Sequence, residues 1–195
     1  MKYVAAAALL VLALVLGTVG LLANRGPGAR VVRTVARYDV PDVTLLDPRG
    51  VKVRLREVLA PGRPVFLQFV YATCTTTSPV LSAAFSSFQR ELAPKGEAVR
   101  LVSVTIDPEN DAPVVLRDYL TRYRAGPTWT FLTGTRKDVD AVMKAFDAFM
   151  PDKERHYPVT FFRGRGEETW VRLQGLVGRA ELVREWKSGT KGSLP

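Results

Sequence analysis

At 195 residues, with 47% hydrophobic and 24% charged side chains, the chain is long enough for one globular domain plus a short additional segment, and its core needs no disulfide support. Its single cysteine excludes an intramolecular disulfide and an all-cysteine zinc site. The net charge of +9 comes from basic residues scattered along the chain without a nucleic-acid motif, so we expect no nucleic-acid partner.

The chain begins with an apolar run. No side chain is charged from Tyr3 to Ala23, and most are Ala, Leu or Val. About 20 apolar residues in a helix span a bilayer, and the run is long for a cleaved signal peptide. We predict a transmembrane signal-anchor over residues 1–23, with a removed signal peptide as the alternative. Residues 24–37 contain chain breakers and charges and are predicted to be a linker.

Strand patterns follow the linker. Residues 33–39 suggest an extended lead-in, and residues 43–47 and 51–55 predict a hairpin around a Pro-Arg-Gly turn. The nearly continuous apolar run over residues 64–71 is typical of a central strand that is covered on both faces.

Helices and strands alternate in the rest of the chain. Ser78 is a suitable N-cap and Pro79 a suitable first residue for a helix that ends near Pro94. Thr135 and Asp138 resemble a capping pair that opens a later helix. The other predicted elements are strands over 99–105, 129–132, 158–162 and 170–173, a helix beginning at Pro113 and a helix over 180–186.

This order predicts an α/β fold. Strands that alternate with helices favour a mainly parallel central sheet with helices on both faces, and the last two strands add antiparallel edges. We place the folded domain at residues 38–187 and a polar tail at 188–195.

Cys74 lies between the predicted strand over 64–71 and the helix that Ser78 opens. The carboxyl end of a strand in an open α/β sheet is where sites form. Helix amide groups and the positive end of the helix dipole favour the thiolate, which is both the nucleophile and the metal ligand. We therefore interpret Cys74 as a functional residue, with a small buried hydrophobic residue as the alternative.

His156 is the only histidine, and it lies two residues before the proline that opens a predicted strand. A neutral imidazole near Cys74 would be a metal ligand or a proton carrier. A histidine on a surface loop is the alternative interpretation.

Several segments in the right order resemble the Sco/SenC family of proteins. The similarity covers roughly residues 38–186, which is nearly all of the predicted soluble part. The segments that carry it are Pro41–Gly50, Phe69–Val80 around Cys74, Val102–Pro113, Phe131–Gly134, and His156 before a strand.

The resemblance implies a thioredoxin-like fold, because that is the fold of the family. Family members are usually membrane-anchored, and they bind copper through two cysteines of a C-x-x-x-C-P motif and a distant histidine. They help to insert copper into cytochrome oxidase, and some act as thiol reductases. For this chain the resemblance implies copper bound by Cys74 and His156, and a respiratory oxidase subunit or another copper-handling protein as partner. It also implies a single-pass inner-membrane protein with its soluble domain on the periplasmic side. The segment 155–160 resembles the cis-proline segment of thioredoxins, which packs against the active cysteine.

One position departs from the family pattern. Ser78 corresponds to the second cysteine of the family, so a dithiol cycle within the chain is lost. A serine hydroxyl is a hard oxygen and a poor match for Cu(I), so we expect weakened copper binding. Met143 and Met150 are candidate thioether ligands, although such residues are more often core or loop residues, and Asp107 would suit Cu(II) better than Cu(I).

Three functions remain open on these residues. The first is a copper-handling assembly factor for a respiratory oxidase with a degenerate site formed by Cys74 and His156. The second is a single-thiol redox protein that acts through mixed disulfides. The third is a non-catalytic docking module. Peroxidase chemistry of the peroxiredoxin type is disfavoured, because Tyr71 occupies the position where those enzymes place a threonine.

Overall fold

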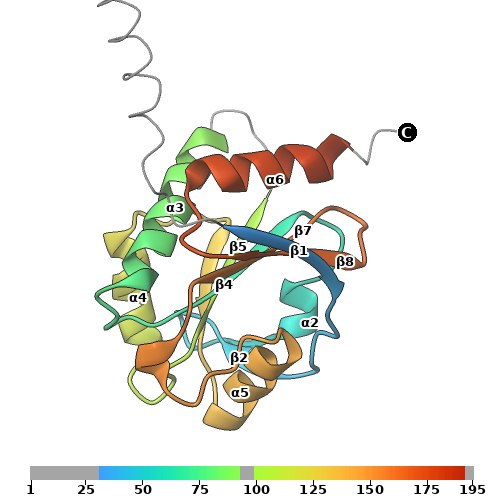
Figure 1. Cartoon of the computed structure of the whole chain (residues 1–195). Coiled ribbons are helices and arrows are strands. Elements are labelled where there is room, and N and C mark those ends of the chain that lie inside the picture. Colours follow the sequence, from blue (N-terminus) through green and yellow to red (C-terminus); the bar gives the residue numbers. More distant parts are fainter. Residues whose placement is uncertain (1–30, 93–98, 192–195) are drawn as a thin grey trace, which may run out of the picture. The chain divides into compact units, whose positions relative to one another are not determined.

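The computed structural model describes residues 31–92 and 99–191, which form a six-stranded mixed sheet with helices on both faces (Figure 1). The predicted anchor at 1–23 lies outside the described residues, as does the linker up to residue 30. Within the described ranges, no helix combines the length and the apolar character that a membrane crossing requires.

The central strands are those with continuous apolar sequences. The strand order is β1-β8-β7-β4-β5-β6, in which β4, β5 and β6 run parallel and the other neighbours pair antiparallel. All six residues of β4 are buried, as expected for a strand covered on both faces. The strands are β1 (Val32–Arg37), β4 (Val65–Val70), β5 (Arg100–Thr105), β6 (Trp129–Leu132), β7 (Val159–Arg163) and β8 (Thr169–Gln174).

The edge strand β1 extends the sheet beyond the expected limit of the domain. Residues 32–37, which we assigned to the linker, pair in register with β8 from Val32 opposite Gln174 to Arg37 opposite Thr169. Five of these six residues are exposed, so the segment lacks the alternation of buried and exposed residues that identifies a strand in a sequence.

The predicted hairpin is present as a separate two-stranded sheet of β2 (Thr44–Leu46) and β3 (Lys52–Arg54). Asp47 shapes the turn, because its Oδ1 accepts hydrogen bonds from the backbone N–H groups of Arg49 at 2.8 Å and Val51 at 2.9 Å. The second arm is shorter than predicted, since Leu55 begins the single-turn helix α2 (Leu55–Val58).

The helices divide the core into two layers. One apolar cluster lies between the sheet and α3, α4 and α6, and the other lies under α5 and the β2–α2 segment (Figure 1). The expectation of helices on both faces is therefore confirmed. The four longer helices are α3 (Thr77–Leu92), α4 (Pro113–Arg122), α5 (Arg136–Ala145) and α6 (Arg179–Lys191).

The starts of two helices test the capping predictions. Thr135 caps α5 as predicted, accepting a hydrogen bond from the Asp138 N–H at 3.1 Å. The N-cap prediction for Ser78 is wrong, because α3 begins at Thr77 and Ser78 is fully buried within its first turn. This shift turns the Ser78 hydroxyl toward the segment that leads to Cys74.

Candidate metal centre

Cys74 lies in the short loop that joins β4 to α3, at the carboxyl ends of the parallel strands. Its N–H donates to the Tyr71 carbonyl at 3.3 Å, which turns the chain back toward the start of α3. The side chain is 6% exposed and packs at the edge of the apolar cluster under α5. The sulfur is thus largely shielded from solvent but stands beside polar groups of the helix start.

Hydrogen bonds around the sulfur favour its ionised form. Burial raises the pKa of Cys74, but hydrogen bonds from Ser78 and Thr76 outweigh it and lower the pKa to about 6. The Ser78 N–H, in the first turn of α3, donates to Sγ at 3.4 Å, and Thr76 Oγ1 lies 3.6 Å away. Cys74 is therefore mainly a thiolate at neutral pH, as the position before a helix suggested.

Ser78 is hydrogen-bonded to the start of this loop. Its hydroxyl oxygen accepts a hydrogen bond from the Tyr71 N–H at 3.2 Å, and its side chain is one of the groups that lower the pKa of Cys74. A hydroxyl with one donor and two lone pairs can fill both roles at once. The serine is therefore tied into the hydrogen bonding of the loop.

His156 follows the short 3₁₀ turn η2 (Lys153–Arg155) and lies before β7. Its Nδ1 is 2.8 Å from the Lys153 carbonyl oxygen, which can only accept, so Nδ1 carries the proton of the neutral ring. Nε2 then holds the lone pair and accepts from the hydroxyl of Thr77 at 2.7 Å. The nitrogen free to bind a metal therefore points at the first residue of α3.

The two side chains meet at Thr77. Its Oγ1 lies 3.7 Å from Cys74 Sγ and 2.7 Å from His156 Nε2, so sulfur and nitrogen are separated by no more than the sum of these distances. The Thr77 hydroxyl has one hydrogen, and it is used toward Nε2. Sequence reasoning singled out Cys74 and His156 but treated Thr77 only as a residue that shapes the loop.

Three contacts hold the histidine segment against the rest of the domain. Tyr71 donates from its hydroxyl to Glu154 Oε2 at 3.0 Å, and its ring lies edge-on to that of His156 at 5.3 Å. Lys153 Nζ lies 2.7 Å from Asp107 Oδ2, and this pair joins η2 to the loop after β5. No cis peptide bond occurs in the described segments, so the resemblance of 155–160 to a cis-proline segment does not extend to the peptide geometry.

A buried carboxylate holds the Cys74 loop from the other side. Asp111 is fully buried, and it accepts from the Ala72 N–H at 3.1 Å and from Thr105 Oγ1 at 2.5 Å. Burial raises the pKa of Asp111. Nothing in the sequence pattern distinguishes this aspartate from the other acidic residues of the same loop.

The expected third ligands are otherwise engaged. The Asp107 carboxylate is buried, pairs with Lys153 and accepts from Asn110 Nδ2 at 3.0 Å, so its oxygens are already engaged. Met143 is 2% exposed in the core under α5, and Met150 is half-buried at the end of the following loop.

The donor set fits a soft, low-coordinate metal ion. Over the described ranges, no group of three or more His, Cys, Asp or Glu residues is arranged to hold a metal. What converges is one thiolate and one imidazole nitrogen, and this pair suits copper better than it suits Mg²⁺ or Ca²⁺, which require oxygen ligands. The pair fits Cu(I) with few ligands and leaves the ion without a second sulfur.

The sequence and the fold of this chain are similar to those of known proteins. Residues 38–161 match the sequence pattern of the family described as SCO1/SenC. Over 130 residues, which are 65% of this chain, the sequence is 27% identical to the SCO1 protein homolog of Bacillus subtilis. The match spans 66% of that relative, just under two thirds of its length, and two further curated relatives are matched over 46% of theirs.

Solved structures share the fold. The structure of BsSco, described as a member of the Sco family of cytochrome c oxidase assembly proteins, superposes with a TM-score of 0.68 at 23% identity, covering 82% of this chain and 98% of that one. The copper-bound structure of ScoI from Arabidopsis thaliana gives a TM-score of 0.66 at 18% identity, covering 80% and 99%. At these identities the likeness establishes the thioredoxin-like fold alone. The chemistry of the site has to be argued from the residues of this chain.

Proposed function

Because the chain belongs to the SCO1/SenC family, we propose that it is a copper-binding assembly factor for a respiratory cytochrome oxidase, with Cys74 and His156 as the copper ligands. The observation that carries the proposal is the convergence of Cys74 Sγ and His156 Nε2 on one atom, Thr77 Oγ1. Copper is here the cargo that the protein receives and passes on. This function is supported by the membership of BsSco in the Sco family of cytochrome c oxidase assembly proteins and by the copper-bound structure of ScoI.

Both ligands are prepared for Cu(I). A thiolate with a pKa of about 6 needs no proton removed at neutral pH before it binds a metal. The Lys153 carbonyl fixes the ring proton of His156 on Nδ1, so Nε2 carries the lone pair that a metal would use. Such a hydrogen bond also makes the imidazole a stronger ligand. The pair supplies one soft and one intermediate donor.

Binding requires a movement of Thr77. Copper bonds to nitrogen and sulfur resemble those of zinc, roughly 2.0–2.3 Å, so a shared ion must lie close to both atoms. The hydroxyl of Thr77 now contacts both atoms and is hydrogen-bonded to Nε2. We infer that its side chain rotates away, and that the lost hydrogen bond lowers the affinity.

Ser78 makes the site degenerate in this proposal. In relatives that follow the C-x-x-x-C-P pattern, a second thiolate would occupy this position. Here the hydroxyl supports the Cys74 thiolate and the Tyr71 N–H, so it contributes charge stabilisation rather than a metal bond. The expected consequence is copper that is held weakly and exchanges readily.

We further propose that residues 1–23 anchor the protein in the inner membrane and that the described domain lies on the periplasmic side. The support is the uncharged apolar run from Tyr3 to Ala23. Carbonate extraction and protease accessibility of the full chain in spheroplasts test this placement. Release by carbonate, or protection of the domain in intact spheroplasts, would contradict it.

Cu(I) titration of the full chain in non-ionic detergent, against a competing chelator, tests the copper site. We expect both Cys74→Ala and His156→Ala to weaken binding by at least about tenfold, because each removes one of two ligands. Ser78→Cys should tighten binding, whereas the control Ser188→Cys, which adds a thiol on the exposed face of α6, should not. Equal affinity in the parent and the Cys74→Ala/His156→Ala variant would overturn the copper site.

A single-thiol redox function is the second candidate, and the lowered pKa of Cys74 favours it. In that case the thiolate attacks a disulfide of a partner, and the mixed disulfide is resolved by a thiol from outside the chain. The two functions separate in the His156→Ala variant, which should lose copper binding but keep thiol exchange. If Cys74→Ala supports oxidase assembly as well as the parent does, the docking-module alternative replaces both.

A further inference from the structure

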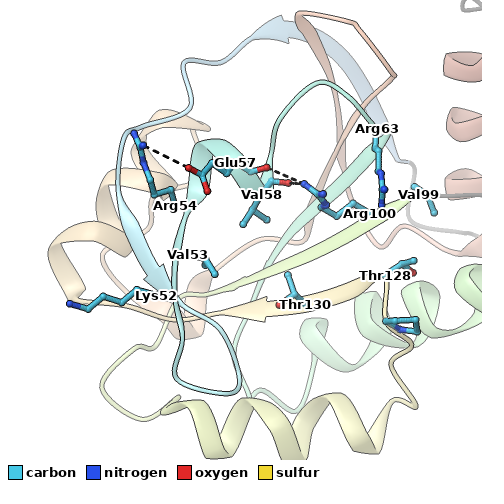
Figure 2. Close-up of a pocket in the computed structure, with 11 residues that line it drawn as sticks. Lys52, Val53, Arg54, Glu57, Val58, Arg63, Val99, Arg100, Thr128 and Thr130 are labelled. Carbon is cyan, nitrogen blue, oxygen red and sulfur yellow. Dashed lines mark hydrogen bonds and ion pairs between the residues drawn. The ribbon is translucent and has the colours of Figure 1, made fainter.

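A basic pocket lies at the amino ends of the parallel strands, whereas Cys74 lies beyond their carboxyl ends. It has a volume of about 650 Å³ and is lined by residues near the beginnings of β4, β5 and β6 together with β3 and α2 (Figure 2). Because β4 ends just before Cys74, the pocket and the candidate copper site lie at the two ends of the same parallel strands. An occupant of the pocket would therefore leave Cys74 accessible.

Two guanidinium groups in this pocket lack a counter-charge. Arg100 donates from Nη1 to the backbone carbonyl oxygens of Glu57 and Val58, and it pairs with no carboxylate of residues 31–92 and 99–191. Arg63 comes from the turn before β4, and among residues 31–92 and 99–191 it has no hydrogen-bonded or ionic partner. Figure 2 shows the Arg63 side chain running toward Arg100.

Among the described residues, Glu57 is the one carboxylate in the lining, and it is already paired. Glu57 lies 3.7 Å from Arg54, whose guanidinium also contacts Asp42 at 3.2 Å. The Lys52 ammonium points away from the other lining side chains (Figure 2). Arg63 and Arg100 are therefore two cations of the pocket that no carboxylate of residues 31–92 and 99–191 neutralises.

Arg63 and Arg100 carry like charges that interact with each other. Burial and the charge of Arg63 both lower the pKa of Arg100, because the two guanidinium groups repel each other. An anion between the two groups would remove the repulsion and fill the open donors of both guanidinium forks. Thr128 and Thr130 line the same pocket, and their hydroxyls make no hydrogen bond within the described part of the chain.

We propose that this pocket binds a phosphate group, held between the guanidinium groups of Arg63 and Arg100 with the hydroxyls of Thr128 and Thr130 as further donors. Guanidinium forks match the oxygen geometry of phosphate in a bidentate manner, and phosphate has enough oxygens for two forks and a hydroxyl together. The phosphate group could belong to a soluble compound or to the headgroup of an anionic lipid. Neither source depends on copper at Cys74.

The soluble source is tested by thermal unfolding of the full chain in non-ionic detergent, in inorganic phosphate or pyrophosphate against chloride at matched ionic strength. Phosphate should raise the unfolding temperature of the parent through mass action. Arg63→Gln should bind about fivefold more weakly, because it removes one charged fork at an exposed site. Arg100→Lys, which keeps the charge but loses the fork, should also weaken binding. Lys137→Gln, an equal loss of charge at an exposed position on α5, should bind like the parent.

The lipid source is tested by flotation of the full chain with vesicles of phosphatidylcholine, with and without phosphatidylglycerol. The apolar N-terminal run is the same in all variants, so differences between them report on the pocket. A preference for phosphatidylglycerol that Arg63→Gln loses and Lys137→Gln keeps supports the lipid headgroup, and a phosphate effect without it supports the soluble compound. If Arg63→Gln matches the parent in both experiments, or Lys137→Gln weakens binding equally, the proposal is overturned.

Discussion

The hydroxyl of Thr77 donates to His156 Nε2 at 2.7 Å, so the lone pair that a metal would use is already engaged. The same oxygen lies 3.7 Å from Cys74 Sγ. One hydroxyl thus contacts both the only thiol of the chain and its only imidazole, and its removal is the sharpest test of how they act together.

Thr77→Val should tighten Cu(I) binding. The substitution keeps the branched shape but removes the hydroxyl, so copper no longer competes with a hydrogen bond worth about 1 kcal/mol, which corresponds to about fivefold in affinity. Competition titration of the full chain provides the measurement. Thr75→Val is the matched control, because Thr75 is an exposed threonine of the same loop. Weaker binding in Thr77→Val would show that the hydroxyl assists the copper site.

The alkylation rate of Cys74 should follow a titration with a midpoint near pH 6. The thiolate is the reactive form, and its pKa is lowered to about 6 by hydrogen bonds from Ser78 and Thr76 that outweigh burial. Ser78→Ala removes one of those hydrogen bonds and should move the midpoint upward, toward the ordinary value of roughly 8.5. The rate of iodoacetamide labelling between pH 5 and 10 is the readout. A parent midpoint at the ordinary value would contradict the hydrogen-bond arrangement.

The same thiolate should make stability depend on pH. Cysteine ionises by losing its proton, and its pKa is lower in the folded chain than in the unfolded chain, so the folded state binds fewer protons between the two values. The stabilisation is full above the unfolded pKa and is lost as the pH falls through about 6. Urea unfolding of the parent and of Cys74→Ala should therefore show a gap that shrinks toward acidic pH. A gap that does not change with pH would exclude a lowered pKa.

Lys153→Met should destabilise the domain and loosen the His156 segment. It leaves the Asp107 carboxylate, 4% exposed, without the ammonium that now lies 2.7 Å away. Because Lys153 itself is 35% exposed, we expect a loss of about 1–3 kcal/mol rather than the larger cost of a fully buried pair. Urea unfolding measures the loss, and Lys137→Met serves as the control.

A double variant identifies the cause of that loss. In Lys153→Met/Asp107→Asn the carboxylate is removed together with its partner, so much of the stability should return. Copper affinity should be lower than in the parent in both the single and the double variant, since the ion pair that joins η2 to the loop after β5 is absent from each. Equal losses in the single and double variants would mean that the ion pair does not account for the effect.

The sheet could be predicted where burial leaves a periodic or continuous apolar pattern. The strand over residues 65–70 is apolar on both faces, and the Thr135 cap precedes an amphipathic helix, so both were identified correctly. The segment 32–37 was predicted only as linker with an extended lead-in, because backbone pairing with β8 holds it in the sheet while most of its side chains face solvent.

The candidate site was predictable only in part. Cys74 and His156 stand out because each is the only residue of its type, and the family resemblance placed them together. The roles of Asp111 and Lys153 depend on contacts across the fold, with Ala72 and Asp107 respectively, which no local pattern encodes. Ser78 was predicted to be a helix cap because its residue type suits that position. The helix instead starts at Thr77, two residues before the predicted first residue Pro79, and Ser78 is buried inside it.

A serine rather than a cysteine at position 78 also affects what happens when an oxidant reaches Cys74. A thiolate converts readily to a sulfenic acid, and in a dithiol site the neighbouring cysteine would condense with it and stop the reaction there. This chain has no second cysteine, so only burial, with the sulfur side chain 6% exposed, slows further oxidation to the irreversible sulfinic acid. Repair of the protein therefore depends on a thiol supplied from outside the chain.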